Sequence, residues 1–284
     1  MARASQTVRV TAALEASDSA GYEQENVHAV YDVIAGHFSS TRYKPWPLVS
    51  DFFDSLPAGS VGVDLGCGNG KYLHLRSALG SGEATKNSLV TLGSDRCLPL
   101  IQAAQHNFPQ NPPTRLIQEV AVADALCSGY RGGVFDYALS IATIHHFSTP
   151  ERRRHAIEEL IRLVKPAPEG LVGTGRGCGR FMVYVWAFEQ RGAGRRLFDA
   201  QLAGHGDATK AQDVLVPWVR TAQHTDDQKQ DVHHRYYHLF REHELDELVN
   251  DAAQHYADTG IHVVKETGGW EKGNWWGVWR VVQR

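Results

Sequence analysis

Hydrophobic positions near the N-terminus follow the spacing of a helix. Between residues 23 and 38 an apolar side chain recurs every three or four positions, with Tyr31 at the edge of the apolar face. This spacing predicts a helix over 23–38, and a second short helix is predicted over 48–56. Between the two helices, Pro45 and Pro47 restrict the backbone and predict a stiff loop.

Short apolar runs then alternate with segments of helical spacing. The runs predict strands over 61–65, 88–94, 115–120, 135–141 and 181–188. Helices are predicted over 69–79, 98–107, 151–164 and 241–250. Alternation at this length implies an α/β fold, with a mostly parallel sheet and helices on both faces. Two further strands, over 261–265 and 275–282, predict a C-terminal antiparallel hairpin with its turn at 271–274.

Three segments lack regular patterning. Residues 1–20 show no apolar periodicity and are predicted to be a disordered tail, which leaves one domain over 21–284. Residues 165–180 are rich in glycine and proline and are predicted to be a flexible connector. Residues 192–230 are polar apart from an apolar run at 214–218, and a long loop of this kind is usually either functional or disordered.

Composition narrows the class of protein. The 284 residues are 42% hydrophobic, yet no apolar run approaches the roughly 18 residues of a membrane span. The N-terminus also lacks the apolar core of a signal peptide. The four cysteines form no Cys-x-x-Cys pair, so neither a zinc site nor a disulfide framework is indicated, and a cytoplasmic or nuclear location is expected. A formal charge of −3 leaves only local basic patches to attract nucleic acid.

The most informative motif follows the strand predicted over 61–65. It reads Asp64-x-Gly66-x-Gly68-x-Gly70, and its glycines would let backbone N–H groups approach a ligand closely. A dinucleotide fingerprint needs its third glycine one position later, where this chain has Lys71. The motif instead resembles motif I of the class I methyltransferases that use S-adenosylmethionine (SAM). The alternative is an ordinary glycine-rich turn between a strand and a helix.

The ends of the next three predicted strands supply further candidates, because ligands bind at the carboxyl ends of strands in open α/β sheets. Asp95 is placed to accept both ribose hydroxyls, and its alternative role is to cap the following helix. Asp124 resembles the acid that binds the adenine amino group in class I methyltransferases, although it can equally be a loop residue. Ile141 opens the segment toward which the donor methyl group would point.

That segment, 140–147, excludes two acceptor chemistries. It lacks the Asn-Pro-Pro-Tyr motif typical of enzymes that methylate exocyclic base amines. It also lacks a cysteine, the nucleophile that methylation of a pyrimidine at carbon 5 requires. The acceptor is therefore predicted to be an oxygen that is already nucleophilic.

Several segments together resemble one family, the eukaryotic tRNA carboxymethyluridine methyltransferases, including the methyltransferase domain fused to an AlkB-type hydroxylase in animals. The resemblance runs from about residue 22 to the end of the chain. The segments that carry it are YEQENVH (22–28), IAGHFSSTRYKPWP (34–47), IHHFST (144–149), YVWA (184–187), VPW (216–218), HRYYHLFR (234–241) and GNWW (273–276).

The resemblance implies a class I fold with a seven-stranded, mostly parallel sheet that ends in an antiparallel hairpin. It implies that the chain esterifies the carboxylate of 5-carboxymethyluridine at the tRNA wobble position, with SAM as donor and S-adenosylhomocysteine (SAH) as product. It also implies a heterodimer with a small zinc-binding activator, which would pair with the edge strand predicted from Arg115 to Val120. Residues 165–180 are longer and richer in glycine than the short turn typical of relatives.

A carboxylate acceptor sets simple requirements. Its pKa is about 4, so it is ionised without a general base, and catalysis then depends on positioning its oxygen in line with the S–CH3 bond. One or two directional donors suit this task better than a full arginine clamp. We predict that His146 or Arg42 orients the carboxymethyl group and that Tyr31 or Trp186 stacks on the uracil. Arg235 is a further candidate, and only one of the adjacent His145 and His146 is expected to face the site.

Contact with tRNA phosphates is predicted for an arginine-rich stretch, although a merely solvated surface is an equal alternative. The stretch contains Arg176, Arg180, Arg191, Arg195 and Arg196.

The sequence leaves two other functions open. One is a class I methyltransferase that acts on a small carboxylic acid, and the other is a non-catalytic scaffold, against which the intact glycine motif argues.

Overall fold

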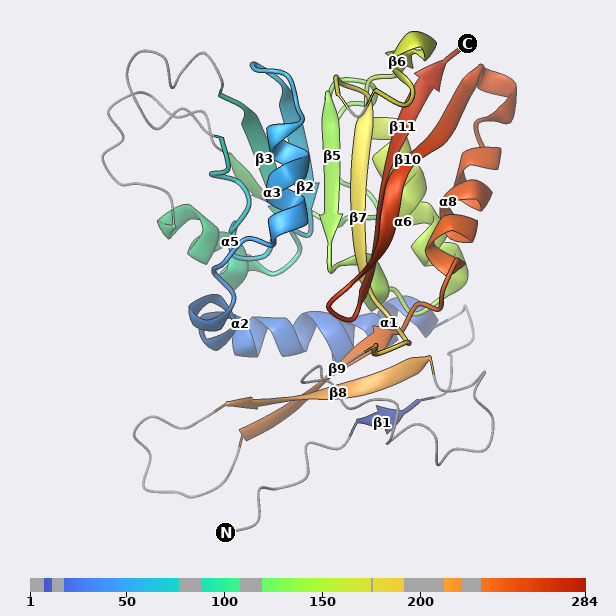
Figure 1. The fold of residues 1–284 in the computed structure, drawn as a ribbon. Helices are drawn as coiled ribbons and strands as arrows, with labels where there is room; N and C mark the ends of the chain where they lie inside the picture. The colour runs from blue at the N-terminus through green and yellow to red at the C-terminus, as the bar shows by residue number, and fades with distance from the viewer. Residues whose placement is uncertain are drawn as a thin grey trace.

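The computed structural model describes residues 8–11, 18–76, 88–107, 119–174, 176–191, 212–220 and 231–284. Figure 1 shows a large twisted sheet with helices on both faces, the N-terminal helices lying across one end of it, and a small second sheet beyond them. The predicted α/β architecture is confirmed.

The main sheet has the strand order β10-β11-β7-β5-β2-β3-β4, and a short strand, β6, adds to β11. Strands β4, β3, β2, β5 and β7 are parallel, whereas β11 and β10 run antiparallel to their neighbours. This is the predicted sheet with its C-terminal hairpin. The bounds are β2 Val61–Leu65, β3 Val90–Asp95, β4 Val120–Val122, β5 Tyr137–Ile141, β6 Ala167–Pro168, β7 Arg180–Trp186, β10 Ile261–Glu271 and β11 Asn274–Gln283.

The helices begin with one continuous run of three segments, because α1 Ser19–Glu23 passes through a π-helical turn, η2 Gln24–His28, into α2 Ala29–Thr41. The others are α3 Pro47–Asp54, α5 Leu98–His106, α6 Pro150–Leu163, α8 Glu244–Gln254 and the short 3₁₀ turns η3 Ile144–His146, η4 Glu169–Leu171 and η6 Ala257–Thr259. The predictions over 98–107 and 151–164 are confirmed to within a residue at each end.

The core lies on both faces of the main sheet, as expected for central parallel strands with apolar residues at successive positions. In β7, Phe181, Val183 and Val185 pack with α6 and α8 on one face. Met182 and Tyr184 of the same strand pack with α3 on the other face. The period of two along β7 therefore fixes which side chains meet which helix layer.

The helix predicted over 69–79 is not formed in its described part. Residues 71–76 make hydrogen-bonded turns instead, and residues 77–79 lie outside the described residues. Arg76 adopts a left-handed backbone with φ of 51°, which a continuing helix does not allow. Its guanidinium donates hydrogen bonds to the carbonyls of Phe53 and Leu56 at 2.5 and 2.8 Å, so it is held at the end of α3.

The strand predicted over 115–120 overlaps the described edge strand only at Val120. The structure places the edge strand β4 at Val120–Val122, and residues 115–118 lie outside the described residues. The helix predicted over 241–250 begins later, at Glu244, because His243 before it has a left-handed φ of 72°. The hairpin strands are longer than predicted, and their turn has Lys272 and Gly273 at positive φ, as a two-residue hairpin turn requires.

The connector over 165–180 is more structured than predicted. Ala167 and Pro168 pair with the end of β11, so the segment adds a short parallel strand to the sheet. The fully buried Arg280 donates hydrogen bonds to the carbonyls of Cys178 and Arg176 at 2.5 and 2.7 Å. The described part of the connector, which omits residue 175, is thus fixed by side-chain bonds that carry no local sequence signal.

A second sheet was not predicted. It consists of β1 Arg9–Val10, β8 Asp213–Arg220 and β9 Asp231–His238, with both pairs antiparallel. Strand β1 and the start of α1 at Ser19 fall within the predicted disordered tail, so this part of the tail prediction is wrong. The rest of the tail, and residues 192–211 and 221–230 of the polar loop, lie outside the described residues.

Candidate active site

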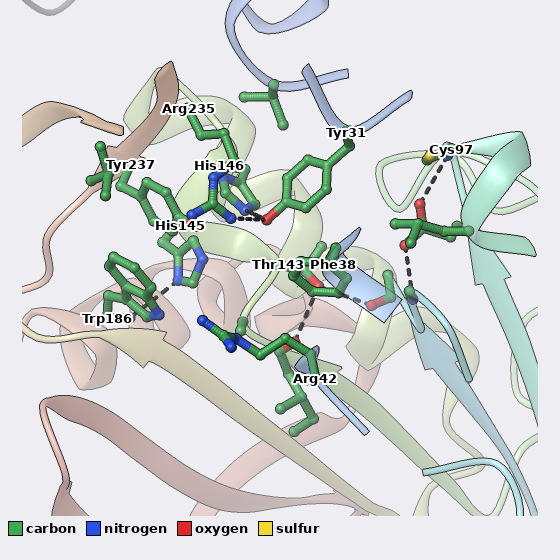
Figure 2. Close-up of a pocket in the computed structure, with 18 of the residues that line it drawn as sticks. Tyr31, Phe38, Arg42, Cys97, Thr143, His145, His146, Trp186, Arg235 and Tyr237 are labelled. Carbon is green, nitrogen blue, oxygen red and sulfur yellow. Dashed lines mark hydrogen bonds between the residues drawn. The ribbon is translucent and has the colours of Figure 1, made fainter. Parts of the chain in front are cut away.

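A cavity of about 1150 Å³ lies at the carboxyl ends of the main-sheet strands and is bounded by the N-terminal helices and the second sheet. Figure 2 shows how side chains from these elements converge on it. Most of the predicted site residues line it: Tyr31, Arg42, Gly66, Gly68, Asp95, Asp124, Ile141, His146, Trp186 and Arg235. Asp64 and Gly70 do not line it.

The glycine turn has the backbone that the motif predicted. Gly66, Gly68 and Gly70 have φ values of +83°, +57° and +75°, which residues with a Cβ rarely adopt. A Cβ on Gly66 would lie 2.2 Å from Thr143 Oγ1, and one on Gly70 would lie 2.9 Å from Ala104 Cβ. Gly70 therefore allows close packing against α5, while Gly66 and Gly68 present backbone to the cavity.

Asp64 is a buried carboxylate whose two oxygens have no hydrogen-bond partner among the described residues. Burial raises its pKa to about 7, although the charge of Lys71 works in the opposite direction. Lys71 lines the cavity, and its ammonium lies 4.7 Å from the ring centre of Trp46. Burial lowers the pKa of Lys71 to about 8. An orphaned acid and a cation at one turn fit the ammonium and carboxylate of a methionine group.

Asp95 accepts hydrogen bonds from two backbone N–H groups, one in the glycine turn and one at the start of α5. Its Oδ2 accepts a hydrogen bond from the Gly68 N–H at 2.9 Å, and its Oδ1 accepts one from the Cys97 N–H at 2.9 Å at the start of α5. Burial raises the pKa of Asp95, and these backbone bonds lower it. Asp95 lines the cavity, and binding of ribose hydroxyls by its carboxylate stays a prediction.

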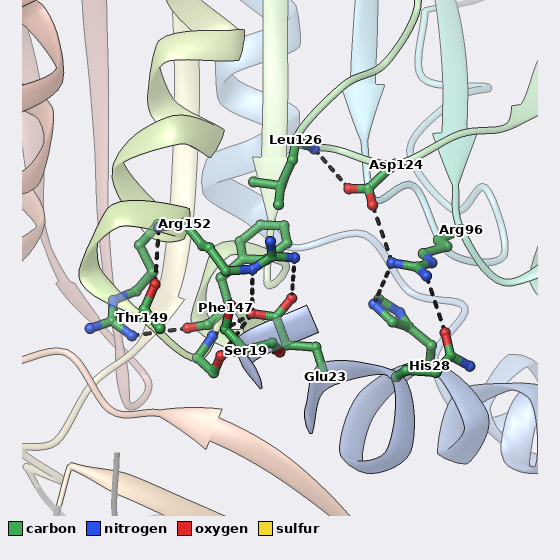
Figure 3. Close-up of polar contacts among 12 residues, drawn as sticks. Ser19, Glu23, His28, Arg96, Asp124, Leu126, Phe147, Thr149 and Arg152 are labelled. Atoms are coloured by element: carbon green, nitrogen blue, oxygen red, sulfur yellow. Dashed lines mark hydrogen bonds and ion pairs between the residues drawn. The ribbon is translucent and has the colours of Figure 1, made fainter. Parts of the chain in front are cut away.

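Asp124 lies in a polar network that joins the strand ends to the π-helical turn η2 (Figure 3). Its Oδ2 forms an ion pair with Arg96 at 3.2 Å, and its Oδ1 accepts from the Leu126 N–H at 2.9 Å. Arg96 also contacts His28 Nε2 at 3.2 Å and Gln24 Oε1 at 3.1 Å. Contact between Asp124 and an adenine amino group stays a prediction, and it would have to share this carboxylate with Arg96.

Glu23 fastens the same N-terminal run to the start of α6 (Figure 3). Its carboxylate is 1% exposed and accepts hydrogen bonds from the Ser148 N–H at 2.7 Å and the Ser148 hydroxyl at 3.0 Å. Arg152 adds two more, from Nε at 2.8 Å and Nη2 at 2.6 Å. Because η2 and α2 carry Val27, His28 and Tyr31 of the cavity wall, this anchor helps to set the position of that wall.

We expect Glu23→Gln to lower the free energy of unfolding by about 1–3 kcal/mol, because the amide would turn an N–H group toward the Arg152 guanidinium in a buried site. Urea unfolding followed by circular dichroism measures this change. Glu25→Gln, at an exposed position of η2, is the control and should change stability by less than about 0.5 kcal/mol. Equal effects from the two variants would contradict the anchoring role.

His146 is buried and uses both ring nitrogens. Its Nδ1 lies 2.8 Å from the Tyr236 carbonyl, which can only accept, so Nδ1 carries the proton. Burial lowers the pKa of His146 to about 3, so the ring is neutral. Its Nε2 therefore accepts a hydrogen bond from the Tyr31 hydroxyl at 3.0 Å. Neither nitrogen is left to orient a substrate carboxylate as predicted.

Arg235 continues this chain of hydrogen bonds by donating from Nη1 to the Tyr31 hydroxyl at 3.1 Å (Figure 2). The residue is 4% exposed, and its guanidinium lies 4.6 Å from the ring centre of Trp218 and 5.2 Å from that of Tyr237. Its Nε has no hydrogen-bond partner, and within the described ranges no carboxylate pairs with it. Arg235 is thus a buried cation that lacks a counter-ion and faces the cavity.

Some of the other candidate residues at the cavity have contacts within the protein that limit their availability to a substrate. His145 is buried, and its Nδ1 accepts from the Trp186 backbone N–H at 3.1 Å. The Trp186 ring stacks on Tyr237 with centres 4.0 Å apart, which leaves only its other face for a base. Arg42 is exposed, and its guanidinium lies 5.3 Å from the Trp218 ring centre. Trp218, Tyr237 and Lys71 line the cavity but were not among the predicted site residues.

The arginine-rich stretch does not form one surface. Arg180 is buried and paired with Glu266 at 2.7 Å, so its predicted contact with phosphate is wrong. Arg191 is exposed at the cavity and paired with Glu242 at 2.7 Å. Arg176 is exposed, whereas Arg195 and Arg196 lie outside the described residues. Among the three described arginines of the stretch, only Arg191 is both exposed and at the site.

Two features are absent from the described part of the chain. No group of three or more histidine, cysteine, aspartate or glutamate residues there has the geometry of a metal site. No helix there is both long and apolar enough to cross a bilayer.

Comparison with known proteins identifies the domain. Residues 63–170 match the family described as a methyltransferase domain. A methyltransferase from Methanosarcina mazei has the same fold, with a TM-score of 0.57 at 17% identity over 85% of this chain and all of that one. A Haloferax volcanii methyltransferase, solved in complex with a methyltransferase activator, gives a TM-score of 0.55 at 16% identity over 91% of this chain and 98% of that one. The fold and the donor SAM are as the sequence predicted.

Closer relatives share one name. The tRNA (carboxymethyluridine(34)-5-O)-methyltransferase of Schizosaccharomyces pombe is 38% identical over 90% of this chain and 96% of its own length. The enzyme of the same name from Saccharomyces cerevisiae is 39% identical over 72% of this chain and 61% of its own length. A longer relative from Xenopus tropicalis is 37% identical over 84% of this chain but 40% of its own length. Near-complete mutual coverage with the first of these places the chain in the family of the tRNA (carboxymethyluridine(34)-5-O)-methyltransferases.

Proposed function

We propose that this chain transfers a methyl group from SAM to the carboxylate of 5-carboxymethyluridine at the wobble position of tRNA. The observation that carries this proposal is Arg235, a buried cation that has no counter-ion among the described residues and lines the same cavity as the glycine turn. A buried charge of this kind is costly to the fold, and an anionic substrate would supply its missing partner.

The acceptor needs no proton removed. The carboxylate oxygen forms the new O–CH3 bond while the S–CH3 bond breaks, and its electron pair passes to sulfur, so that the products are a neutral ester and SAH. SAM supplies an activated methyl group when it is bound. The protein must then hold the carboxylate oxygen in line with that bond, which is a task of positioning rather than of acid–base catalysis.

The hydrogen bonds and ring contacts at the cavity lead us to assign different roles to the predicted site residues. Arg235 is the residue that we propose orients the carboxylate, and Arg42 is an exposed second cation across the Trp218 ring. Tyr31 and the neutral His146 fix the guanidinium of Arg235 through the two hydrogen bonds described above. They are therefore positioning residues. The indole rings of Trp186 and Trp218 are the surfaces that we propose hold the uracil.

We also propose that an activator subunit pairs with β4. This strand ends the main sheet, and no strand of the described residues pairs with its outer edge. Val122 on the strand is 53% exposed and Leu98 at the start of α5 is 52% exposed, an apolar surface that pairing would cover. The family resemblance suggests a small zinc-binding partner. We place the reaction in the cytoplasm or nucleus, where cysteines stay reduced, in keeping with four free cysteines.

The proposal is tested by mixing the chain and its activator with methyl-labelled SAM and tRNA that lacks the final ester. Label should appear on the RNA and should be released by mild base, because a methyl ester hydrolyses whereas an N-methyl or C-methyl group does not. Label that resists base would contradict esterification. If label is transferred instead to a small carboxylic acid and never to tRNA, the alternative of a small-molecule methyltransferase replaces the proposal.

A further inference from the structure

The turn between α2 and α3 has an exposed aromatic residue at the mouth of the cavity. It spans residues 42–46, of which Arg42 and Trp46 line the cavity. Between these two lies Tyr43, which is 60% exposed. No other large apolar side chain of the described residues is more exposed. Lys44 is exposed as well, with its ammonium 5.8 Å from the Tyr43 ring centre. Apart from this lysine, no side chain of the described residues makes a ring contact with Tyr43.

The turn is held firmly from within. Asn69 of the glycine turn is 2% exposed, and its amide donates to the Arg42 carbonyl at 3.3 Å and to the Ser39 carbonyl at 3.4 Å. Trp46 packs against Tyr184 with ring centres 5.1 Å apart. The exposed Tyr43 therefore sits on a backbone that is fixed to the cofactor turn, which lowers the entropy cost of presenting it to a ligand.

A further cation lies beside this turn. The hairpin turn at Lys272 lies against the 42–46 turn, because Trp46, Pro47 and Lys272 line one small groove. Lys272 is 77% exposed at its side chain. The acid of this groove, Glu271, accepts a hydrogen bond from the Tyr184 hydroxyl at 2.9 Å and lies 3.7 Å from Lys272. An exposed ring among cations suits a ligand that has flat bases and a charged backbone.

We propose that the 42–46 turn is a docking surface for single-stranded RNA, in which Tyr43 stacks on a base beside the target nucleotide and Lys44 and Lys272 contact phosphates. This inference rests on the proposed function. A target base that enters the cavity must leave its stack, so its neighbours lose a stacking partner at the mouth. Tyr43 replaces that partner, and such stacking tolerates any base because every base has a π-face.

The test uses the full chain coexpressed with its activator, and a tRNA anticodon stem-loop that carries 5-carboxymethyluridine. Tyr43→Ala should weaken binding of this RNA in the presence of SAH by about tenfold and raise its KM similarly, with kcat little changed. Tyr43→Phe should retain binding, because the ring remains. Val33→Ala, at an exposed apolar position on α2, is the control and should have no effect. Lys44→Gln should reduce the slope of log K against log salt by about one.

Binding and turnover are read separately, so the two proposals can fail separately. Unchanged RNA affinity in Tyr43→Ala overturns the docking inference even if the wild-type chain methylates tRNA normally. Absence of wild-type turnover, with RNA binding still dependent on Tyr43, overturns the proposed function alone. Loss of the copurified activator from Tyr43→Ala, with RNA affinity intact, would identify the turn as a protein interface and would also overturn the inference.

Discussion

Arg235→Met is expected to lower kcat/KM for tRNA that carries 5-carboxymethyluridine by at least about 100-fold. The substitution keeps an apolar chain against the Trp218 and Tyr237 rings but removes the only buried cation that we propose meets the substrate carboxylate. Removing one partner of a buried, hydrogen-bonded charge pair costs about 2–5 kcal/mol, and each 1.36 kcal/mol is a factor of ten in rate. Initial rates of label transfer measure the loss.

The same variant should not be less stable. The guanidinium of Arg235 has no counter-ion within the described ranges, so its replacement removes an uncompensated buried charge. We expect its melting temperature to stay the same or to rise while activity falls, and SAH affinity to stay unchanged. Arg42→Met, at the exposed guanidinium on the same indole, should have a smaller effect on turnover. Normal turnover in Arg235→Met would contradict the assignment.

The parts of the site that could be predicted from sequence are those in which one local pattern carries all the information. The glycine turn, the acid at the end of β3 and the order of strands and helices each depend on residues that are close together in the chain. A positive φ at Gly66 and the hydrogen bonds that the Gly68 and Cys97 N–H groups donate to Asp95 follow from a strand that ends in a tight turn. These features were recognised for that reason.

The environment of Arg235 could not be found in this way. Its neighbours Tyr31, Trp218 and Tyr237 come from α2, β8 and β9, and they meet only because β8 and β9 pair across a long polar stretch of sequence. The roles of His146 and Arg180 were misjudged for a related reason. Their hydrogen bonds and ion pairs, with Tyr236, Tyr31 and Glu266, join distant segments, and whether a charged or polar residue is free depends on those partners.

Asp64→Asn is expected to weaken binding of SAH by at least about tenfold at pH 8 and to remove the rise in affinity with pH near 7. In the wild-type chain the pKa of Asp64 is raised to about 7 by burial, so the carboxylate is largely protonated below that pH. An ionised Asp64, which lies behind the cavity wall, attracts the ligand ammonium through an ordered water, whereas the protonated acid does not. Wild-type affinity should therefore rise as pH increases through about 7, and it should fall again above about 8 as Lys71 loses its proton.

The stability of the ligand-free protein tests the direction of the pKa shift of Asp64. Because the pKa of Asp64 is higher in the folded than in the unfolded chain, its ionisation costs stability as pH rises from about 4 through about 7. Asp64→Asn should thus raise the melting temperature at pH 8 while it weakens the binding of SAH. A variant that loses binding without losing stability separates the two effects. Calorimetric titration of SAH from pH 6 to pH 9, in two buffers of different ionisation enthalpy, measures both affinity and proton release. The exposed Asp54→Asn is the control, and a wild-type affinity that is flat across this range would contradict the role of Asp64.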